Sequence, residues 1–534
     1  MLRGLMQDDH PLTLQHVLER QRRFHAEATC VSATAEGATR TSYGEIAARV
    51  DRAVSGLQRL GIAPGDRVAT LAWNTREHFE VYLAAPCAGA VLHTLNARLS
   101  PEQIEQIVTH AQDRVIFVDR SLAGLLASLR DRLPSVERIV VFDADEGPEL
   151  AGAIGYEAFL AEADAPPRYP ALEDRAAAGL CYTSGTTGEP KGVLYSHRSL
   201  MLHSLMLGTA DVLGVGTRER ILPVVPMFHA NAWGIPYAAA LLGAELVLPN
   251  RFLSPEPLAR LIEEERPTIA AGVATVWHGL LRHADEHGTD LSSLRLLLCG
   301  GAPMPRSLME AFEDRHGVRM VQAWGMTETA PFAAVATPPA GVDGERDRRY
   351  RSRTGRLVPL LDMRVVGDDG AELPWDDEHA GELHVRGPWI ASQYYAADGP
   401  DERFADGWLR TGDVVRITPD GFVTITDRAK DLIKSGGEWI SSVELENHLM
   451  AHPAVAEAAV VARADERWGE RPAAFVVRAP GASCDAAALR EHLTPLVPSW
   501  WLPDPQDVVF VEGLPKTSVG KFDKKAMRAL LAPA

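Results

Sequence analysis

The sequence predicts an α/β protein with a large N-terminal domain of two α/β subdomains plus a β-rich subdomain, followed by a small α+β C-terminal domain. Three observations support this fold class. A chain of 534 residues exceeds what one hydrophobic core normally serves, so two or more units are expected. Strand-like and helical patterns alternate through most of the chain, which is typical of parallel sheets covered by helices. After residue 356 the pattern changes to short strands separated by Gly and Asp turns.

The first α/β block contains clear strand and helix patterns. Residues 66–72 and 114–118 are strand-like, and residues 76–88 have helical spacing. Residues 100–103 (Ser-Pro-Glu-Gln) supply an N-cap, a proline at the first helical position and a glutamine at the reciprocal capping position. We therefore expect a helix to begin there.

The later elements define a second block, the β-rich subdomain and a separate C-terminal unit. The second block covers residues 220–322, with strands expected at 244–248 and 294–298. A charged segment follows the β-rich part, and we place the domain boundary there, giving domains of residues 1–429 and 430–534. The remaining expected elements are strands at 362–366, 381–386, 421–426, 456–462 and 473–477, and helices at 442–450 and 484–493.

Composition and charge exclude several classes of protein. The formal net charge of −18 argues against nucleic-acid binding and against docking on anionic lipid, since both need clustered Lys and Arg. Five scattered cysteines have no metal-ligand spacing, so neither a disulfide framework nor a zinc site is expected. The first ten residues lack the apolar core of a signal peptide, and the longest apolar stretches are too short for a transmembrane segment. We therefore expect a cytoplasmic protein.

A segment rich in glycine and hydroxyl groups, residues 182–192, carries the clearest chemical signal. Its three glycines let the backbone approach a polyanion and turn N–H groups toward phosphate oxygens, and Lys191 adds a mobile positive charge. The Gly-Lys-Ser/Thr ending of a Walker loop is absent. The alternative is a polar surface loop. The candidate phosphate-binding residues here are Thr183, Ser184, Gly185, Thr186, Thr187, Gly188 and Lys191.

This segment resembles the phosphate loop of the adenylate-forming superfamily, which contains acyl-CoA synthetases, peptide-synthetase adenylation domains and luciferases. Five further segments resemble motifs of the superfamily in the same order, so the resemblance covers essentially the whole chain. Within the superfamily, the sequence is most similar to bacterial medium- and long-chain fatty acyl-CoA ligases. The five segments are residues 225–233 (acid pocket), 322–329 (adenine and metal), 407–413 (ribose), 427–440 (hinge and following turn) and 515–521 (lysine loop).

The resemblance implies a reaction of ATP, a carboxylic acid and coenzyme A through an acyl-adenylate. Attack of a carboxylate on the α-phosphate joins two anions, so cations must neutralise the crowded charge. Lys521 is implied to bridge the acid and the α-phosphate, with an ordinary surface lysine as the alternative. Glu328 and Thr187 are implied to hold Mg²⁺, which prefers a few oxygen ligands plus phosphate. Taken alone, Glu328 would be interpreted as a solvated surface acid.

The resemblance also assigns residues to the nucleoside. Trp324, where many relatives have tyrosine, is implied to stack on adenine, with a core tryptophan as the alternative. Asp413 is implied to accept both ribose hydroxyls, which an ionised carboxylate can do; its alternative is a turn-capping aspartate. Arg428 is implied to contact ribose or phosphate. The other residues assigned to the nucleotide site are Gly301, Ala302, Pro303, Gly325, Met326 and Thr327.

The second half-reaction needs coenzyme A to reach the adenylate while water is excluded. The family achieves this by rotating the C-terminal domain about one residue, so the resemblance implies a mobile C-terminal domain with Lys430 as its hinge. Lys434, Gly436 and Gly437 are implied to line the tunnel for the pantetheine arm. Taken alone, the two glycines would indicate a plain turn.

The identity of the acid is less well specified. Phe228, His229 and Trp233 belong to a largely apolar segment that suits an aliphatic or aromatic tail. By resemblance, Trp233 is a gate over a fatty-acid tunnel, with a packed core residue as the alternative. We therefore expect an ATP-dependent acid–CoA ligase acting on medium- or long-chain fatty acids. The same resemblance suggests a homodimer.

Two other functions stay open. An adenylate-forming enzyme could activate an aromatic, short or other specialised acid and pass it to a non-CoA acceptor, since these enzymes share the fold and the first half-reaction. The second alternative is a binding protein that has lost catalysis. Such a protein should have lost charged site residues, whereas Lys191, Glu328, Asp413, Arg428 and Lys521 are all present.

Overall fold

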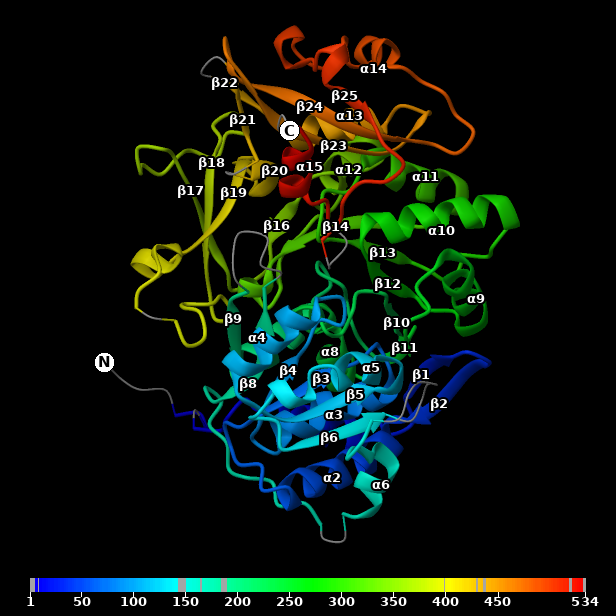
Figure 1. Cartoon of the computed structure of the whole chain (residues 1–534), viewed down its shortest axis with the longest axis vertical. Helices are drawn as coiled ribbons and strands as arrows, with labels where there is room; N and C mark the ends of the chain where they lie inside the picture. Colours follow the sequence, from blue (N-terminus) through cyan, green and yellow to red (C-terminus); the bar gives the residue numbers. More distant parts are fainter. Residues whose placement is uncertain are drawn as a thin grey trace.

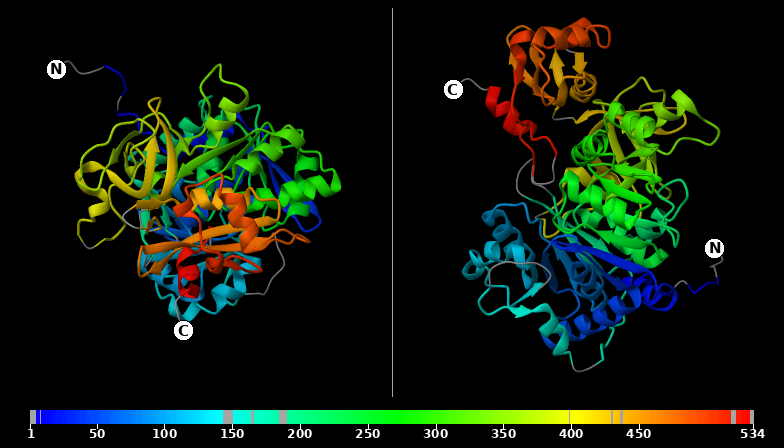
Figure 2. Two further views of the ribbon diagram at one scale, coloured as in Figure 1. Left: turned by 90° about the horizontal axis from the view of Figure 1, so that it is seen from above. Right: turned by 90° about the vertical axis from the view of Figure 1, so that its right-hand side faces the viewer.

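The computed structural model describes residues 5–7, 9–142, 150–163, 166–183, 190–397, 399–428, 431–435, 438–517 and 521–531. Within these ranges the chain forms a large N-terminal body and a smaller C-terminal unit at one end of it (Figure 1). Figure 2 shows that the last part of the chain reaches back from this unit toward the N-terminal body. None of the helices in the described ranges is long and apolar enough to span a bilayer.

The first α/β subdomain is built on a seven-stranded sheet in the order β7-β6-β5-β3-β4-β8-β9. Its neighbouring strands are parallel except for the antiparallel pair β8–β9. The strands expected near 66–72 and 114–118 are confirmed as β3 and β5. The bounds are β3 Arg67–Leu71, β4 Val91–Thr94, β5 Asp113–Asp119, β6 Arg138–Phe142, β7 Ile154–Gly155, β8 Ala177–Tyr182 and β9 Gly192–Ser196.

The second α/β subdomain and the β-rich subdomain share one continuous sheet of thirteen strands, in the order β17-β18-β19-β20-β16-β15-β14-β13-β12-β10-β11-β1-β2. The strands from β14 to β1 are parallel neighbours, with β2 antiparallel at the edge, and they meet an antiparallel part at the β14–β15 pair. The sequence predicted the two blocks but not their union. The bounds are β1 Thr29–Thr34, β2 Gly37–Ser42, β10 Arg220–Pro223, β11 Glu245–Leu248, β12 Ile269–Gly272, β13 Leu296–Cys299, β14 Met320–Gly325, β15 Phe332–Val335, β16 Gly355–Leu357, β17 Asp362–Val366, β18 Gly381–Arg386, β19 Leu409–Ile417 and β20 Phe422–Arg428.

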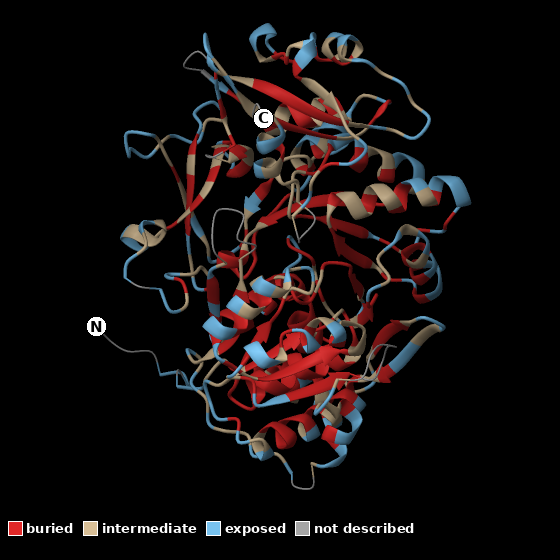
Figure 3. Ribbon diagram, in the orientation of Figure 1, coloured by how far each residue is buried: buried red, intermediate tan, exposed pale blue. Residues whose placement is uncertain are grey.

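Helices join the two N-terminal sheets into one core and cover their outer faces. The main core combines residues of both sheets with α1, α2, α3, α6, α7 and α8, and Figure 3 shows how strongly these elements are buried. Separate clusters pack α4 and α5 on the first sheet, and α9, α10 and α11 on the second. The predicted capping box of Ser100 and Gln103 is confirmed at the start of α4. The helix bounds are α1 Leu14–Phe24, α2 Tyr43–Arg59, α3 Arg76–Cys87, α4 Pro101–Ala111, α5 Ala123–Ala127, α6 Tyr156–Ala161, α7 His197–Leu207, α8 Ile235–Leu242, α9 Pro255–Glu265, α10 Ala274–His287, α11 Arg306–His316 and α12 Gly344–Arg351.

The C-terminal unit is a mixed sheet in the order β22-β21-β24-β23, with β25 paired to β24. Helices α13 and α14 pack on one side of it, and α15 packs on the other. The expected helix at 442–450 is confirmed as α13, and the two expected strands extend further than predicted as β23 and β24. The bounds are β21 Ile433–Ser435, β22 Glu438–Ile440, α13 Ser442–Met450, β23 Val455–Asp465, β24 Gly469–Arg478, α14 Ala486–Leu493, β25 Val508–Phe510 and α15 Lys524–Leu531.

Candidate active site

A cavity of about 760 Å³ lies between the N-terminal body and Lys521 of the C-terminal unit. Part of its wall follows the carboxyl ends of β13 and β14, which are parallel neighbours, so the residues after these strands meet at one edge of the sheet. A second cavity of about 240 Å³ adjoins it, because Gly301, Trp324 and Lys521 line both. The two cavities together bring residues from all six predicted motifs to one place.

Thr183 and Lys191, which are expected to flank the phosphate site, line one end of the cavity. The Thr183 N–H donates to the Lys191 carbonyl at 2.9 Å, and the Lys191 N–H donates to Thr183 Oγ1 at 3.1 Å. The Lys191 ammonium lies 3.0 Å from the carboxylate of Asp401. The predicted phosphate ligands between these two flanks lie outside the described residues; they are Ser184, Gly185, Thr186, Thr187 and Gly188.

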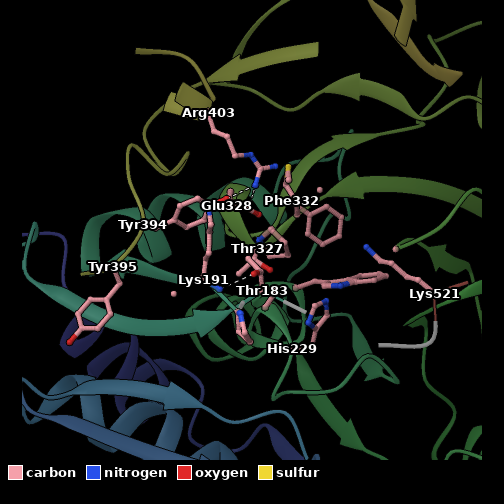
Figure 4. A pocket seen from close by; sticks show the side chains of 18 of the residues that line it. Thr183, Lys191, His229, Thr327, Glu328, Phe332, Tyr394, Tyr395, Arg403 and Lys521 are labelled. Carbon is pink, nitrogen blue, oxygen red and sulfur yellow. Dashed lines mark hydrogen bonds and ion pairs between the residues drawn. The ribbon is translucent and has the colours of Figure 1, made fainter. Parts of the chain in front are cut away.

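Glu328 follows β14 and lines the same cavity (Figure 4). It is only 3% exposed, and its Oε1 accepts a hydrogen bond from the Tyr394 hydroxyl at 2.7 Å. Arg403 forms an ion pair with the same oxygen at 3.4 Å. Burial, followed by the Glu328 carboxylate, raises the pKa of Tyr394, so its hydroxyl stays a donor at neutral pH.

The Glu328 carboxylate fits a metal ion whose other ligands come from a bound substrate. Among the described residues, no three His, Cys, Asp or Glu side chains group closely enough to hold an ion on their own. Mg²⁺ is typically bound by one or two carboxylates together with substrate phosphates. Glu328, which faces the cavity near Lys191, meets this requirement.

Two glycines of this region are required by close approach or by backbone conformation. A Cβ on Gly325 would lie 1.7 Å from the carbonyl oxygen of Pro331, so no side chain fits there. Gly301 has a φ of +81°, which L-residues rarely adopt, and its Cβ position lies 3.7 Å from Lys521 Cε. Both positions let the backbone close around the cavity without filling it.

The residues expected to bind the nucleoside form a hydrogen-bonded group. The Trp324 indole N–H donates to Asp413 Oδ2 at 2.9 Å, and Arg428 Nε lies 3.2 Å from Asp413 Oδ1. Asp413 and Arg428 are cross-strand partners on β19 and β20. Ala302 and Pro303 line the second cavity beside them. The sequence suggested separate roles for Trp324 and Asp413, whereas the structure joins them directly.

Lys521 reaches the cavity from the C-terminal unit, on the side away from Tyr394 (Figure 4). Burial, with smaller effects from Lys521 and Arg98, lowers the pKa of His229 to about 3. His229 is therefore neutral at physiological pH and can accept a hydrogen bond beside the cationic Lys521.

A buried charge cluster holds the start of α15, three residues after Lys521. Lys524 Nζ lies 2.7 Å from the Glu446 carboxylate and donates to Ser442 Oγ at 2.5 Å, so α15 is fixed to α13. Asp427, at the end of β20, accepts the N–H of Ser442 at 2.7 Å. These contacts connect the Lys521 segment to the N-terminal body through α13.

The segment expected to bind the acid has an unusual backbone. Ala230, Asn231, Ala232 and Trp233 all have positive φ between 41° and 58°, and Gly234 continues the turn with a φ of 74°. This left-handed run places the Trp233 ring edge-on to Phe332, with centroids 5.8 Å apart. Trp233 is 8% exposed and lines the cavity. The left-handed run was not predicted, because alanine and tryptophan favour negative φ.

Two predicted residues within the described ranges lie away from the walls of both cavities. Phe228 is absent from the wall of either cavity; its ring packs near Trp73 and under Arg98. Lys434 lies on β21 with its ammonium 4.2 Å from the centre of the Trp439 ring, also away from both cavities. Gly436 and Gly437 lie outside the described residues, as does the predicted hinge Lys430.

Sequence reasoning missed the segment between β18 and β19 that lines the cavity beside Lys191. Tyr394, Tyr395, Asp401 and Arg403 all line the cavity. Their spacing has neither a helical nor a strand period, so no local pattern marks them. A run of polar and aromatic residues just before the predicted ribose motif was the one available signal.

Two protein families match this chain and together cover most of it. Residues 18–395 match the AMP-binding enzyme family, and residues 444–521 match the AMP-binding enzyme C-terminal domain. The solved structure of the anthranilate CoA ligase AuaEII in complex with anthranoyl-AMP is similar, with a TM-score of 0.88 and 27% identity over 98% of each chain. This likeness confirms the predicted fold class.

Similar sequences include enzymes named for different acids. A 3-methylmercaptopropionyl-CoA ligase of Ruegeria lacuscaerulensis is 44% identical over 97% of this chain and 97% of its own. A long-chain-fatty-acid–CoA ligase of Thermus thermophilus is also 44% identical, over 97% of this chain and 96% of its own. Identity to these relatives therefore does not distinguish between the two kinds of acid.

Proposed function

The chain belongs to the AMP-binding enzyme family and is an ATP-dependent acyl-CoA ligase that acts through an acyl-adenylate, and we propose that its acid is a medium- or long-chain fatty acid. The observation that carries this proposal is the apolar wall beyond His229. Trp233, Pro331 and Phe332 line it, and such a surface suits an aliphatic tail. The likeness to a long-chain-fatty-acid–CoA ligase supports the same choice.

In the first half-reaction, the acid carboxylate lies beside Lys521 and His229 while its tail follows the apolar wall. The phosphates of ATP lie toward Thr183 and Lys191. The carboxylate oxygen attacks the α-phosphorus, the bond to the β-phosphate bridging oxygen breaks, and pyrophosphate leaves. Lys521 draws the two anions together and Lys191 offsets charge on the phosphates. Ser184, Gly185, Thr186 and Gly188 are proposed to complete the phosphate site.

The nucleoside half of ATP is proposed to occupy the region where the two cavities join. Trp324 would stack on adenine and Asp413 would accept the ribose hydroxyls, with Arg428 beside the ribose or phosphate. Glu328 and Thr187 are proposed to hold Mg²⁺, which would supply further charge neutralisation at the phosphates. The other proposed nucleotide-site residues are Gly301, Ala302, Pro303, Gly325, Met326 and Thr327.

In the second half-reaction, the thiol of coenzyme A attacks the acyl carbon and AMP leaves. We propose that the C-terminal domain, residues 430–534, rotates about Lys430 so that Lys434, Gly436 and Gly437 line the pantetheine path. The position of Lys434 away from both cavities is consistent with a rotation between the two steps. A cytoplasmic homodimer is the proposed assembly, and light scattering would test its size.

A short sulfur-containing acid is the second candidate. It is favoured by the equal identity to a 3-methylmercaptopropionyl-CoA ligase and by the Trp233 ring, which lines the cavity and packs edge-on against Phe332. A large ring in the wall restricts the length of tail that the cavity accepts without movement. The two candidates therefore differ in whether Trp233 must move.

The test is thioester and AMP production with acetate, 3-methylmercaptopropionate, octanoate, palmitate, cinnamate and benzoate, each with and without coenzyme A. We expect the highest kcat/KM with octanoate or palmitate. We also expect Trp233→Ala to raise the ratio of kcat/KM for palmitate to kcat/KM for octanoate, because it removes a large ring from the cavity wall. The highest kcat/KM with 3-methylmercaptopropionate would replace the fatty-acid proposal. Pyrophosphate release without thioester would indicate another acceptor.

A further inference from the structure

Tyr394 lies at the centre of the charged groups at the phosphate end of the cavity (Figure 4). Its hydroxyl donates to Glu328 Oε1 at 2.7 Å and accepts a hydrogen bond from Arg403. The Lys191 ammonium lies 4.6 Å from the centre of its ring. One side chain, 4% exposed, therefore contacts the carboxylate and both cations.

These contacts orient the Glu328 carboxylate. Tyr394 and Arg403 both contact Oε1 of Glu328. None of the described residues donates a hydrogen bond to Oε2. A carboxylate held by one oxygen presents the other in a fixed direction. Because Glu328 lines the cavity, Oε2 is the oxygen left for a bound cation.

The backbone around Tyr394 is fixed to both walls of the cavity. The N–H of Ala391 donates to the Glu328 carbonyl at 2.8 Å, and the N–H of Tyr395 donates to the Gly192 carbonyl at 2.8 Å. Gly192 follows Lys191 directly, so the segment joins the phosphate loop to the strand end that carries Glu328. Tyr394 is thereby held between the two groups it contacts.

We propose that Tyr394 is a positioning residue: its hydroxyl aims Glu328 at the metal of Mg-ATP, and its ring holds Lys191 beside the phosphates. This inference rests on the proposed role of Glu328 as a Mg²⁺ ligand. It predicts two separable effects. The hydroxyl governs the gain in ATP affinity that Mg²⁺ provides, whereas the ring governs ATP affinity in the absence of metal.

The experiment measures ATP affinity of the full chain by calorimetry, in Mg²⁺ and in EDTA, without any acid. Tyr394→Phe keeps the ring and removes the hydroxyl. It should reduce the Mg²⁺-dependent gain in ATP affinity by about tenfold, which is the lower end of the range for losing a hydrogen bond to a charged group. ATP affinity in EDTA should be unchanged. Tyr394→Leu should also weaken binding in EDTA by about twofold to fivefold, the range for an exposed cation–π contact.

Tyr350→Phe is the matched control. The Tyr350 hydroxyl also donates to a carboxylate, that of Asp420 at 2.8 Å, but it lies on α12 outside both cavities. This variant should bind ATP as the wild type does in both conditions. A thermal melt of each variant checks that the fold is retained.

The proposal would be overturned by a Mg²⁺-dependent gain in Tyr394→Phe equal to that of the wild type, or by a wild type whose ATP affinity is the same in Mg²⁺ and EDTA. Loss of affinity in EDTA by Tyr394→Phe would also contradict it, because the hydroxyl would then act without metal. The ATP measurements contain no acid, so they stay valid even if none of the fatty acids is converted to a thioester. The proposal on Tyr394 and the proposal on the fatty acid can therefore fail separately.

Discussion

Replacing Trp324 by phenylalanine tests whether the adenine wall and the ribose carboxylate act as one unit. Phenylalanine keeps an aromatic face for stacking but removes the indole N–H that donates to Asp413 Oδ2 at 2.9 Å. Asp413 is 2% exposed, so water cannot readily replace the lost donor. The carboxylate then keeps Arg428 as its other charged partner, at 3.2 Å from Oδ1.

The expected magnitude follows from the charge of the acceptor. A hydrogen bond to a charged group contributes about 1.5–3 kcal/mol, which corresponds to about 10- to 150-fold in affinity if all of it affects binding. Because Arg428 still holds one oxygen, we expect the smaller value. Trp324→Phe should therefore weaken ATP binding about tenfold, with the largest change in KM for ATP.

The assay is ATP affinity by calorimetry, together with KM and kcat for pyrophosphate release. Trp277→Phe is the matched control, since the Trp277 indole N–H donates to the Leu298 carbonyl at 3.1 Å within the core of the second subdomain. It should lower thermal stability without changing ATP affinity. Wild-type ATP affinity in Trp324→Phe would refute the reasoning, because the indole N–H would then have no part in holding Asp413 for ribose.

Replacing Lys521 by alanine should abolish acyl-adenylate formation but leave most coenzyme A attack when preformed acyl-AMP is supplied; equal loss of both half-reactions, measured separately, would contradict the proposed rotation. A pH effect on stability is also expected, because burial lowers the pKa of His78 and His197 to about 4 and that of His203 to about 3. As pH falls, the unfolded chain, with histidine pKa values near 6.5, takes up protons before the folded chain does. The contribution of these neutral, buried histidines to the free energy of unfolding is therefore complete above about pH 6.5 and is lost as pH falls toward 4. Thermal melts from pH 7 to 5 should show a falling Tm with a smaller slope in His203→Phe, and an equal slope would argue against neutral burial of His203.

Sequence patterns were sufficient for elements whose causes lie within a few residues. The helix at Ser100 follows from a capping box that spans four positions, and α13 begins after Ser441, whose side chain caps it. Hydrophobic patterns located nine strands, with members in each of the three sheets, to within a few residues. Most of the candidate site residues that the motif resemblance indicated line the two adjoining cavities, including Lys191, Glu328 and Lys521.

Contacts between distant segments were decided by the tertiary structure alone. The bond from Tyr394 to Glu328 crosses 66 residues, and the bond from Trp324 to Asp413 crosses 89. The union of the parallel and antiparallel blocks at β14–β15, and the left-handed turn that aims Trp233, belong to the same class. Local propensity and spacing determine which residues form a helix or strand, but they carry no information on which strand edges pair or which side chains meet. Those outcomes depend on burial and hydrogen bonding summed over the whole packed chain.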